Sequence, residues 1–140
     1  MDLSIDTYSG VGPLRFGMSA EEVRTVMGLP FRTFKKTPAA LLPTDFFVDV
    51  GLHVYYKVPG KCEAIEMATP AEPTLDGLLL IGRPFSEVRE WFENRDDSVI
   101  VDGSGLTSTR YGVGLYAPHA AKKPREPIEG VIVFERGYYD

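Results

Sequence analysis

Residues 12–68 of this chain share a pattern with residues 77–135. Aligning GPLRFGMSAEEVR (12–24) with GLLLIGRPFSEVR (77–89) gives six identities without a gap: two glycines, one leucine and the run Glu-Val-Arg. Two further matches follow in the same order, GLHVY (51–55) with GVGLY (112–116) and AIEM (64–67) with VIVF (131–134). Three matches in one order favour duplication over chance. We therefore expect one structural unit to be built twice.

The first copy contains a short helix with clear ends. Ser19 and Glu22 have the spacing of a capping box, which predicts a helix beginning at Ala20. Gly28 suits a left-handed stop and Pro30 prevents continuation. In the second copy Pro84 suits a first helical turn, and the helix is expected to run toward Asn94 with Trp91 as a core anchor.

Strand composition follows each helix, since the stretches there are rich in Val, Phe, Tyr and Ile and are interrupted by Gly and Pro. Val58-Pro59-Gly60-Lys61 predicts a type II turn joining strands at 52–57 and 62–68. The matching connection, 117–128, is longer and is expected to be a mobile basic loop. The fold class is therefore predicted as α+β: a tandem β-α-β-β-β unit in one compact domain (1–140), with two short helices packed on antiparallel sheet.

Alternation along the strands assigns side chains to two faces of the sheet. The face toward the helices is expected to hold Leu52, Val54, Ile65, Met67, Val113, Leu115, Ile132 and Phe134. The opposite face is expected to hold His53, Tyr55, Lys57, Cys62, Ala64, Glu66, Tyr116, Val131 and Val133. The second face is mixed and partly aromatic, so it is the candidate for recognition.

Composition excludes several classes of protein. A chain of 140 residues with 44% hydrophobic and 25% charged residues is typical of one folded domain. No apolar run approaches the ~20 residues of a membrane span. The net charge of −5 disfavours a broad nucleic-acid surface. With one cysteine and an acidic start, MDLSIDTYSG, the sequence predicts a cytoplasmic protein.

The run RFGMSAEEV (15–23), closed by GLP (28–30), resembles a signature of small bacterial helix-plus-sheet modules. These modules include the β-lactamase inhibitor proteins and the BamE/SmpA outer-membrane lipoproteins. The inhibitor proteins are similar in a second respect, because they repeat a helical segment and antiparallel sheet in tandem. The resemblance implies protein binding through a sheet face and its loops, without catalysis, and it transfers no functional residue to this chain.

Residues capable of catalysis or metal binding are few. His53 and His119 lie in no recognisable motif, and the first is expected on a sheet face and the second in a solvated loop. Asp45, Asp49 and His53 are spaced by fours, but the local sequence favours strand, so no metal site is predicted. Cys62 is expected to be a buried, inert thiol. No cofactor is expected, because the glycines match no nucleotide-binding motif.

Three functions remain open from the sequence. The first is a non-enzymatic protein-binding or inhibitory module, of which an immunity-type protein of unknown target is one form. The second is a small-ligand binder or an unrecognised enzyme with a pocket between the two units, and the third is a structural subunit of a larger assembly. The predicted partner-binding residues, for another protein as partner, are His53, Tyr55, Lys57, Tyr116, Lys122, Lys123 and Arg125.

Overall fold

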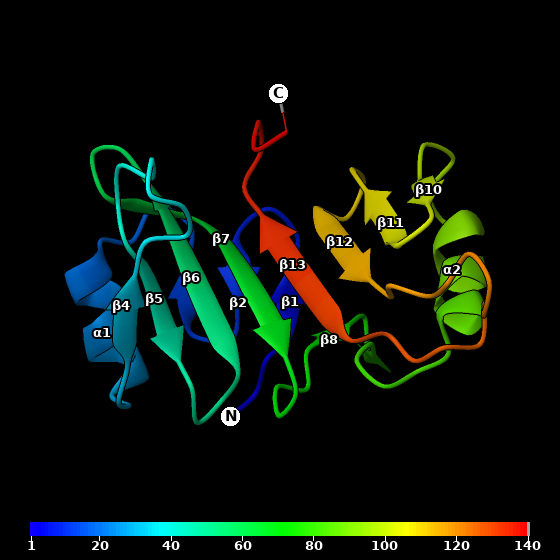
Figure 1. Cartoon of the computed structure of the whole chain (residues 1–140), viewed down its shortest axis with the longest axis horizontal. Coiled ribbons are helices and arrows are strands. Elements are labelled where there is room, and N and C mark those ends of the chain that lie inside the picture. The colour runs from blue at the N-terminus through cyan, green and yellow to red at the C-terminus, as the bar shows by residue number, and fades with distance from the viewer. Residues whose placement is uncertain (140) are drawn as a thin grey trace.

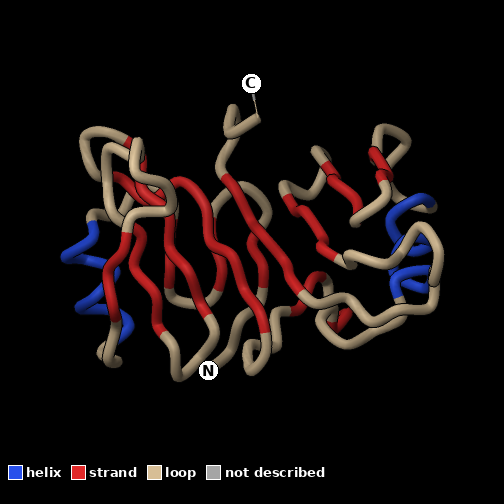
Figure 2. The backbone as a smooth tube through the Cα atoms, viewed as in Figure 1, coloured by secondary structure: helices blue, strands red, loops and turns tan. Residues whose placement is uncertain are grey.

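The computed structural model describes residues 1–139 and is built around one large antiparallel sheet (Figure 1). Its strands are β4 (Arg32–Phe34), β5 (Thr44–Phe47), β6 (Leu52–Lys57), β7 (Lys61–Ala68), β10 (Ile100–Asp102), β11 (Gly105–Ser108), β12 (Val113–Tyr116) and β13 (Gly130–Phe134). The second layer contains β1 (Ile5–Asp6), β2 (Gly10–Val11), β3 (Leu14–Arg15), α1 (Ala20–Met27), β8 (Thr74–Leu75), β9 (Leu78–Leu79) and α2 (Phe85–Glu93). Figure 2 shows the two helices at opposite ends of the molecule.

The large sheet has the strand order β10-β11-β12-β13-β7-β6-β5-β4, so the last strand of each half meets the other at the centre. In this central pair Ile65 lies opposite Val133 and Met67 opposite Val131. The α+β class with antiparallel sheet is confirmed. Each helix is preceded by a small sheet and followed by four strands, which is more than the predicted β-α-β-β-β unit contains.

The start of α1 has the geometry that its sequence predicts. The Glu22 amide donates to the Ser19 hydroxyl and the Ser19 amide donates to the Glu22 carboxylate, both at 3.1 Å. Gly28 ends the helix with φ 59°, in the left-handed region. Val23 and Met27 are the buried residues of this helix, so its packing face is narrow.

The start of α2 is capped by the chain that follows β12. Pro84 offers no side-chain acceptor, and the amides of Phe85 and Ser86 donate instead to the carbonyls of Glu126 and Pro124, at 2.8 and 2.7 Å. These bonds satisfy donors that a helix start leaves free. The loop 117–128, which was expected to be mobile, is thus anchored through its second half to the start of α2.

Trp91 is not the main core anchor of α2. Phe92 is fully buried, whereas Trp91 is only partly buried, with the Arg95 guanidinium 4.1 Å from its ring centre. A cation over an indole face is itself favourable. The helix therefore packs through Phe92, and Trp91 lies at the boundary with solvent.

The sheet register corrects the predicted faces by one residue in β13. Ile132 lies opposite Glu66, and Phe134 lies opposite Ala64, on the side away from the helices. Val131 and Val133 point into the core instead, with 1% and 2% exposure. In a strand, a shift of one residue exchanges the two faces. Leu52, Val54, Ile65, Met67, Val113 and Leu115 are buried as expected.

The β6–β7 hairpin forms where predicted, but two details differ. The hydrogen bond that closes its turn runs from the Gly60 amide to the Lys57 carbonyl, at 2.6 Å. The turn thus lies one residue earlier than the predicted type II turn at residues 58–61. The ladder is also irregular between Tyr55 and Tyr56. This irregularity brings Tyr56 and its partner Cys62 to the core side of the sheet.

A partly buried ion pair joins α1 to the sheet. Asp45 on β5 is fully buried and accepts two hydrogen bonds from Arg24, at 2.8 and 2.9 Å, and a third from the Tyr56 hydroxyl at 2.8 Å. These contacts satisfy a carboxylate that would otherwise be costly to bury. The hydrogen bonds to Asp45 also raise the pKa of the Arg24 guanidinium.

We expect Asp45→Ala to lower the free energy of unfolding by about 2–3 kcal/mol, because Arg24 and Tyr56 lose a buried acceptor. Urea unfolding followed by circular dichroism measures the change. Asp49→Ala is the matched control, since Asp49 is exposed on the turn after β5, and it should change the value by less than ~0.5 kcal/mol. Equal stability of the two variants would contradict the structural role given to the Asp45 carboxylate.

Candidate functional site

The side of the large sheet away from the helices is called here the open face. Across its centre, the register places Phe46, His53, Glu66, Ile132 and Gly114 side by side. No helix covers this row, because the buried residues of α1 and α2 belong to the core on the other side. This row of the open face is therefore available to a partner.

Four rings on the first half of the open face form the aromatic patch, defined as Phe34, Phe46, His53 and Tyr55. The Phe46 and His53 rings are stacked with centres 4.2 Å apart, as expected for cross-strand neighbours. Phe34 meets His53 edge-on at 5.8 Å, and Tyr55 lies parallel to His53 at 6.5 Å. Phe34 is 42% exposed, so the patch reaches solvent at the β4 edge.

The electrostatics of the patch keep its rings uncharged near neutral pH. Burial lowers the pKa of His53 and outweighs the opposing effect of the Glu66 carboxylate. The pKa of the Tyr55 hydroxyl is raised by burial and by Glu66, to which it donates at 3.0 Å. Lys36 adds a cation 4.4 Å from the Tyr55 ring centre.

A pocket of about 330 Å³ adjoins the aromatic patch at Tyr55. Its lining combines apolar, cationic, acidic and phenolic groups: Lys36, Ala40, Leu41, Leu42, Thr44, Tyr55, Tyr56, Lys57, Val58, Glu63 and Tyr138. Lys57 is held at its rim by the Glu135 carboxylate at 2.7 Å, which raises the pKa of the Lys57 ammonium. The pocket can accept an apolar side chain next to polar groups.

The last described residues fold back over the open face. Glu135 donates its amide to the Glu63 carbonyl at 3.0 Å, and the Tyr138 ring stacks on Phe134 with centres 5.7 Å apart. Tyr138 lines the pocket, and Tyr139 meets Phe134 edge-on at 4.9 Å. These contacts explain why Phe134 is only 3% exposed although it points away from the helices.

The structure separates the predicted binding residues into three places. His53 and Tyr55 belong to the aromatic patch, and Lys57 lies beside it at the pocket rim. Tyr116 is 53% exposed on the second half of the open face, opposite Gly130.

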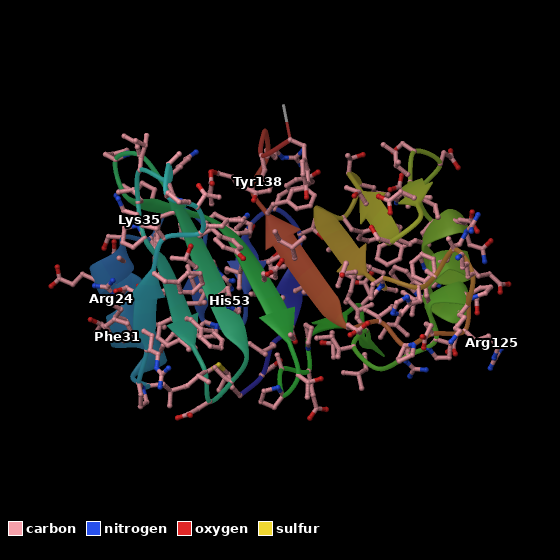
Figure 3. All side chains as sticks on the ribbon, viewed as in Figure 1. Arg24, Phe31, Lys35, His53, Arg125 and Tyr138 are labelled. Carbon is pink, nitrogen blue, oxygen red and sulfur yellow. The ribbon has the colours of Figure 1, made fainter. Side chains whose placement is uncertain are left out.

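The basic residues Lys122, Lys123 and Arg125 lie elsewhere, in the loop that caps α2. Figure 3 shows Arg125 at one end of the molecule and His53 near its middle. The basic loop and the aromatic patch therefore do not form one site.

Phe34, Phe46, Lys36 and Tyr138 were not predicted as site residues. The cross-strand pairing of Phe46 with His53 depends on the β5–β6 register, which the sequence does not specify. Phe34 and Lys36 lie in the exposed run FRTFKK (31–36), where alternating aromatic and basic residues were a visible signal. Tyr138 reaches the pocket only through the fold of the last residues.

Other candidate chemistry finds no support in the geometry. Cys62 is buried, and burial raises the pKa of its thiol to about 12, so it stays protonated. Within residues 1–139, no three side chains of His, Cys, Asp or Glu are grouped to hold a metal ion. Neither His53 nor Cys62 lines the pocket beside Tyr55.

Comparisons with known proteins give no relative from which a role could be transferred. No family model, curated protein or solved structure matches the chain. In residues 1–139, neither helix has the length and apolar character that crossing a membrane requires.

We expect the His53 imidazole to titrate below its ordinary value of 6.5, because the folded state buries it among rings. NMR titration of its ring protons measures the midpoint. The unfolded chain then binds the proton more readily, so wild-type stability should fall relative to a His53→Gln variant as the pH drops from about 7 to 5. A His119→Gln variant serves as control. A His53 midpoint at or above 6.5 would contradict this assignment.

Proposed function

We propose that this chain is a non-enzymatic protein-binding or inhibitory module of a bacterial cytoplasm, and that its partner binds the aromatic patch. An immunity-type role toward a toxin is one form of such a function. The observation that carries the proposal is the partly exposed ring cluster of Phe34, Phe46, His53 and Tyr55, on a sheet face that neither α1 nor α2 covers.

Aromatic side chains favour binding for a physical reason. They bury much apolar area at little cost in conformational entropy, and interface hot spots are enriched in them. The neighbouring pocket offers space for a side chain of the partner, and Lys36 at its lining supplies a cation for an acidic group. A flat ring cluster beside a pocket suits a protein surface better than a small molecule.

The chemistry of the same residues favours binding over catalysis. A general base needs a partner whose proton it can take, and it works best with a pKa near neutral pH. His53 is instead stacked on Phe46, with a lowered pKa. Cys62, the one thiol of the chain, is buried away from the open face.

We also propose that the two halves derive from one duplicated unit. Supporting this, the amide of Gly17 donates to the Cys62 carbonyl and the amide of Gly82 donates to the Ile128 carbonyl, both at 2.9 Å. The return bonds also match, from Cys62 to Met18 and from Ile128 to Arg83. Gly17 and Gly82 have nearly equal φ, 93° and 90°.

A second candidate function is the binding of a small ligand in the pocket beside Tyr55. Its volume of about 330 Å³ lies at the lower end of the range for such sites. Two lysines at its lining would favour an anionic ligand. The aromatic patch lies outside this pocket except for Tyr55, and its exposure is better explained by a protein partner.

We expect Tyr55→Ala and Phe46→Ala to reduce capture of the partner at least ~10-fold, as hot-spot truncations do. The tagged chain is used to capture proteins from lysate of its native host, and the bound proteins are quantified by mass spectrometry. Val26→Ala is the matched control, because Val26 is 44% exposed on α1, away from the open face. Circular dichroism confirms that each variant is folded.

The Tyr116→Ala variant tests whether the second half of the open face takes part in binding. If Val26→Ala loses the same proteins as Tyr55→Ala, or if no protein depends on the aromatic patch, the proposed role of the patch is wrong. Loss with Tyr55→Ala alone, and not with Phe46→Ala, would favour the pocket over the patch.

A further inference from the structure

The large sheet ends in two strands that have one neighbour each. β4 pairs only with β5, and all three of its residues are exposed. β10 pairs only with β11, and Ile100 on it is 63% exposed. Within residues 1–139, neither strand makes a backbone hydrogen bond on its outer side. Unpaired strand edges of this kind can take up a further strand.

The outward peptide groups of each edge belong to its central residue. The Ala68 amide donates to the Gly51 carbonyl at 3.0 Å. Along an antiparallel strand, the N–H and C=O groups of successive residues point alternately to the two neighbouring strands. Following this alternation through the registers of β6, β5 and β4, the Asp45 peptide group points toward β6 and the Thr33 peptide group points outward. At the other edge, the Phe134 amide donates to the Gly112 carbonyl. The same alternation through β12, β11 and β10 directs the Val101 peptide group outward.

We propose that β4 of one copy of this chain pairs with β10 of the next copy, with Thr33 opposite Val101. In this register each of the two central residues donates its N–H to the other's carbonyl. The strands have the required direction, because eight antiparallel strands leave β4 and β10 running in opposite senses. The next copy then continues the sheet with its open face on the same side.

The side chains are complementary in that register. Arg32 comes opposite Asp102 and Phe34 comes opposite Ile100, all four on the open face. An opposite-charge pair and an apolar pair therefore accompany the two hydrogen bonds. On the other face Thr33 meets Val101, and both side chains are small and β-branched.

Pairing of like edges lacks this complementarity. If two β4 strands met at Thr33, Arg32 would lie opposite Phe34, so neither an opposite-charge pair nor an apolar pair would form. If two β10 strands met at Val101, Asp102 would lie opposite Ile100. Charged residues at short edges disfavour such like pairs. The contact is thus between unlike surfaces, and it leaves one free edge at each end of the assembly.

The test is sedimentation velocity of the pure chain, which requires no other partner and is therefore independent of the proposed function. Edges of three residues bury little area, so we expect association with a dissociation constant of about 0.1–1 mM. The weight-average mass should rise above the 15.5 kDa of one chain as concentration increases. High salt should weaken the association, because it screens Arg32 from Asp102.

Variants locate the contact. Thr33→Pro and Val101→Pro each remove one outward N–H, which an edge strand tolerates, and each variant alone should remain a monomer. Arg32→Glu and Asp102→Asn should weaken association without disturbing the fold, since Asn keeps the acceptor that Asp102 offers to the Ser104 amide at 2.8 Å. Arg15→Glu, an exposed cation on β3, is the control and should associate like wild type.

A mixing experiment distinguishes unlike from like edges. The Thr33→Pro chain keeps an intact β10 edge, and the Val101→Pro chain keeps an intact β4 edge. An equimolar mixture should therefore form a dimer of one chain of each kind and nothing larger. A wild-type chain that stays monomeric at about 1 mM, a Thr33→Pro variant that associates like wild type, or a mixture without heterodimer would each overturn the proposal.

Discussion

The pairing of β7 with β13 is the contact on which the rest of the structure depends. It joins the last strands of the two halves and makes one eight-stranded sheet from two four-stranded sheets. Because Ile65 and Met67 lie beside Val133 and Val131, the two halves share one core, and the buried cluster contains residues of both. The same pairing puts the aromatic patch and Tyr116 on one face of a continuous sheet.

The helices depend on the same frame but are attached to it differently. α1 caps itself through Ser19 and Glu22 and is joined to the sheet by the ion pair between Arg24 and the buried Asp45. α2 has no side-chain cap and borrows carbonyls from the loop after β12. One half therefore carries its own cap and a short hairpin, while the other uses a long basic loop as a structural part. That loop is thereby removed from the aromatic patch.

How far the sequence predicts the protein depends on the range of the interactions involved. Local signals were reliable: the capping box at Ser19 and Glu22, the stop at Gly28 and the β6–β7 hairpin all have the predicted place. The faces of β6 and β12 were predicted correctly, whereas that of β13 was wrong by one residue. The pattern match aligned Ile132 and Phe134 with Ile65 and Met67. Only the pairing of β13 with β7 determines which of Val133 and Phe134 faces the helices.

The sequence by itself determined the ends of the two helices, the strands of the β6–β7 hairpin and the α+β class, because these follow from neighbours a few residues apart. The tertiary structure alone decided which side chains meet. In it, Phe46 stacks on His53, Tyr138 lines the pocket beside Tyr55, and the basic loop contacts the start of α2. Those contacts join residues distant in the chain, and strand register, which no short segment encodes, sets them.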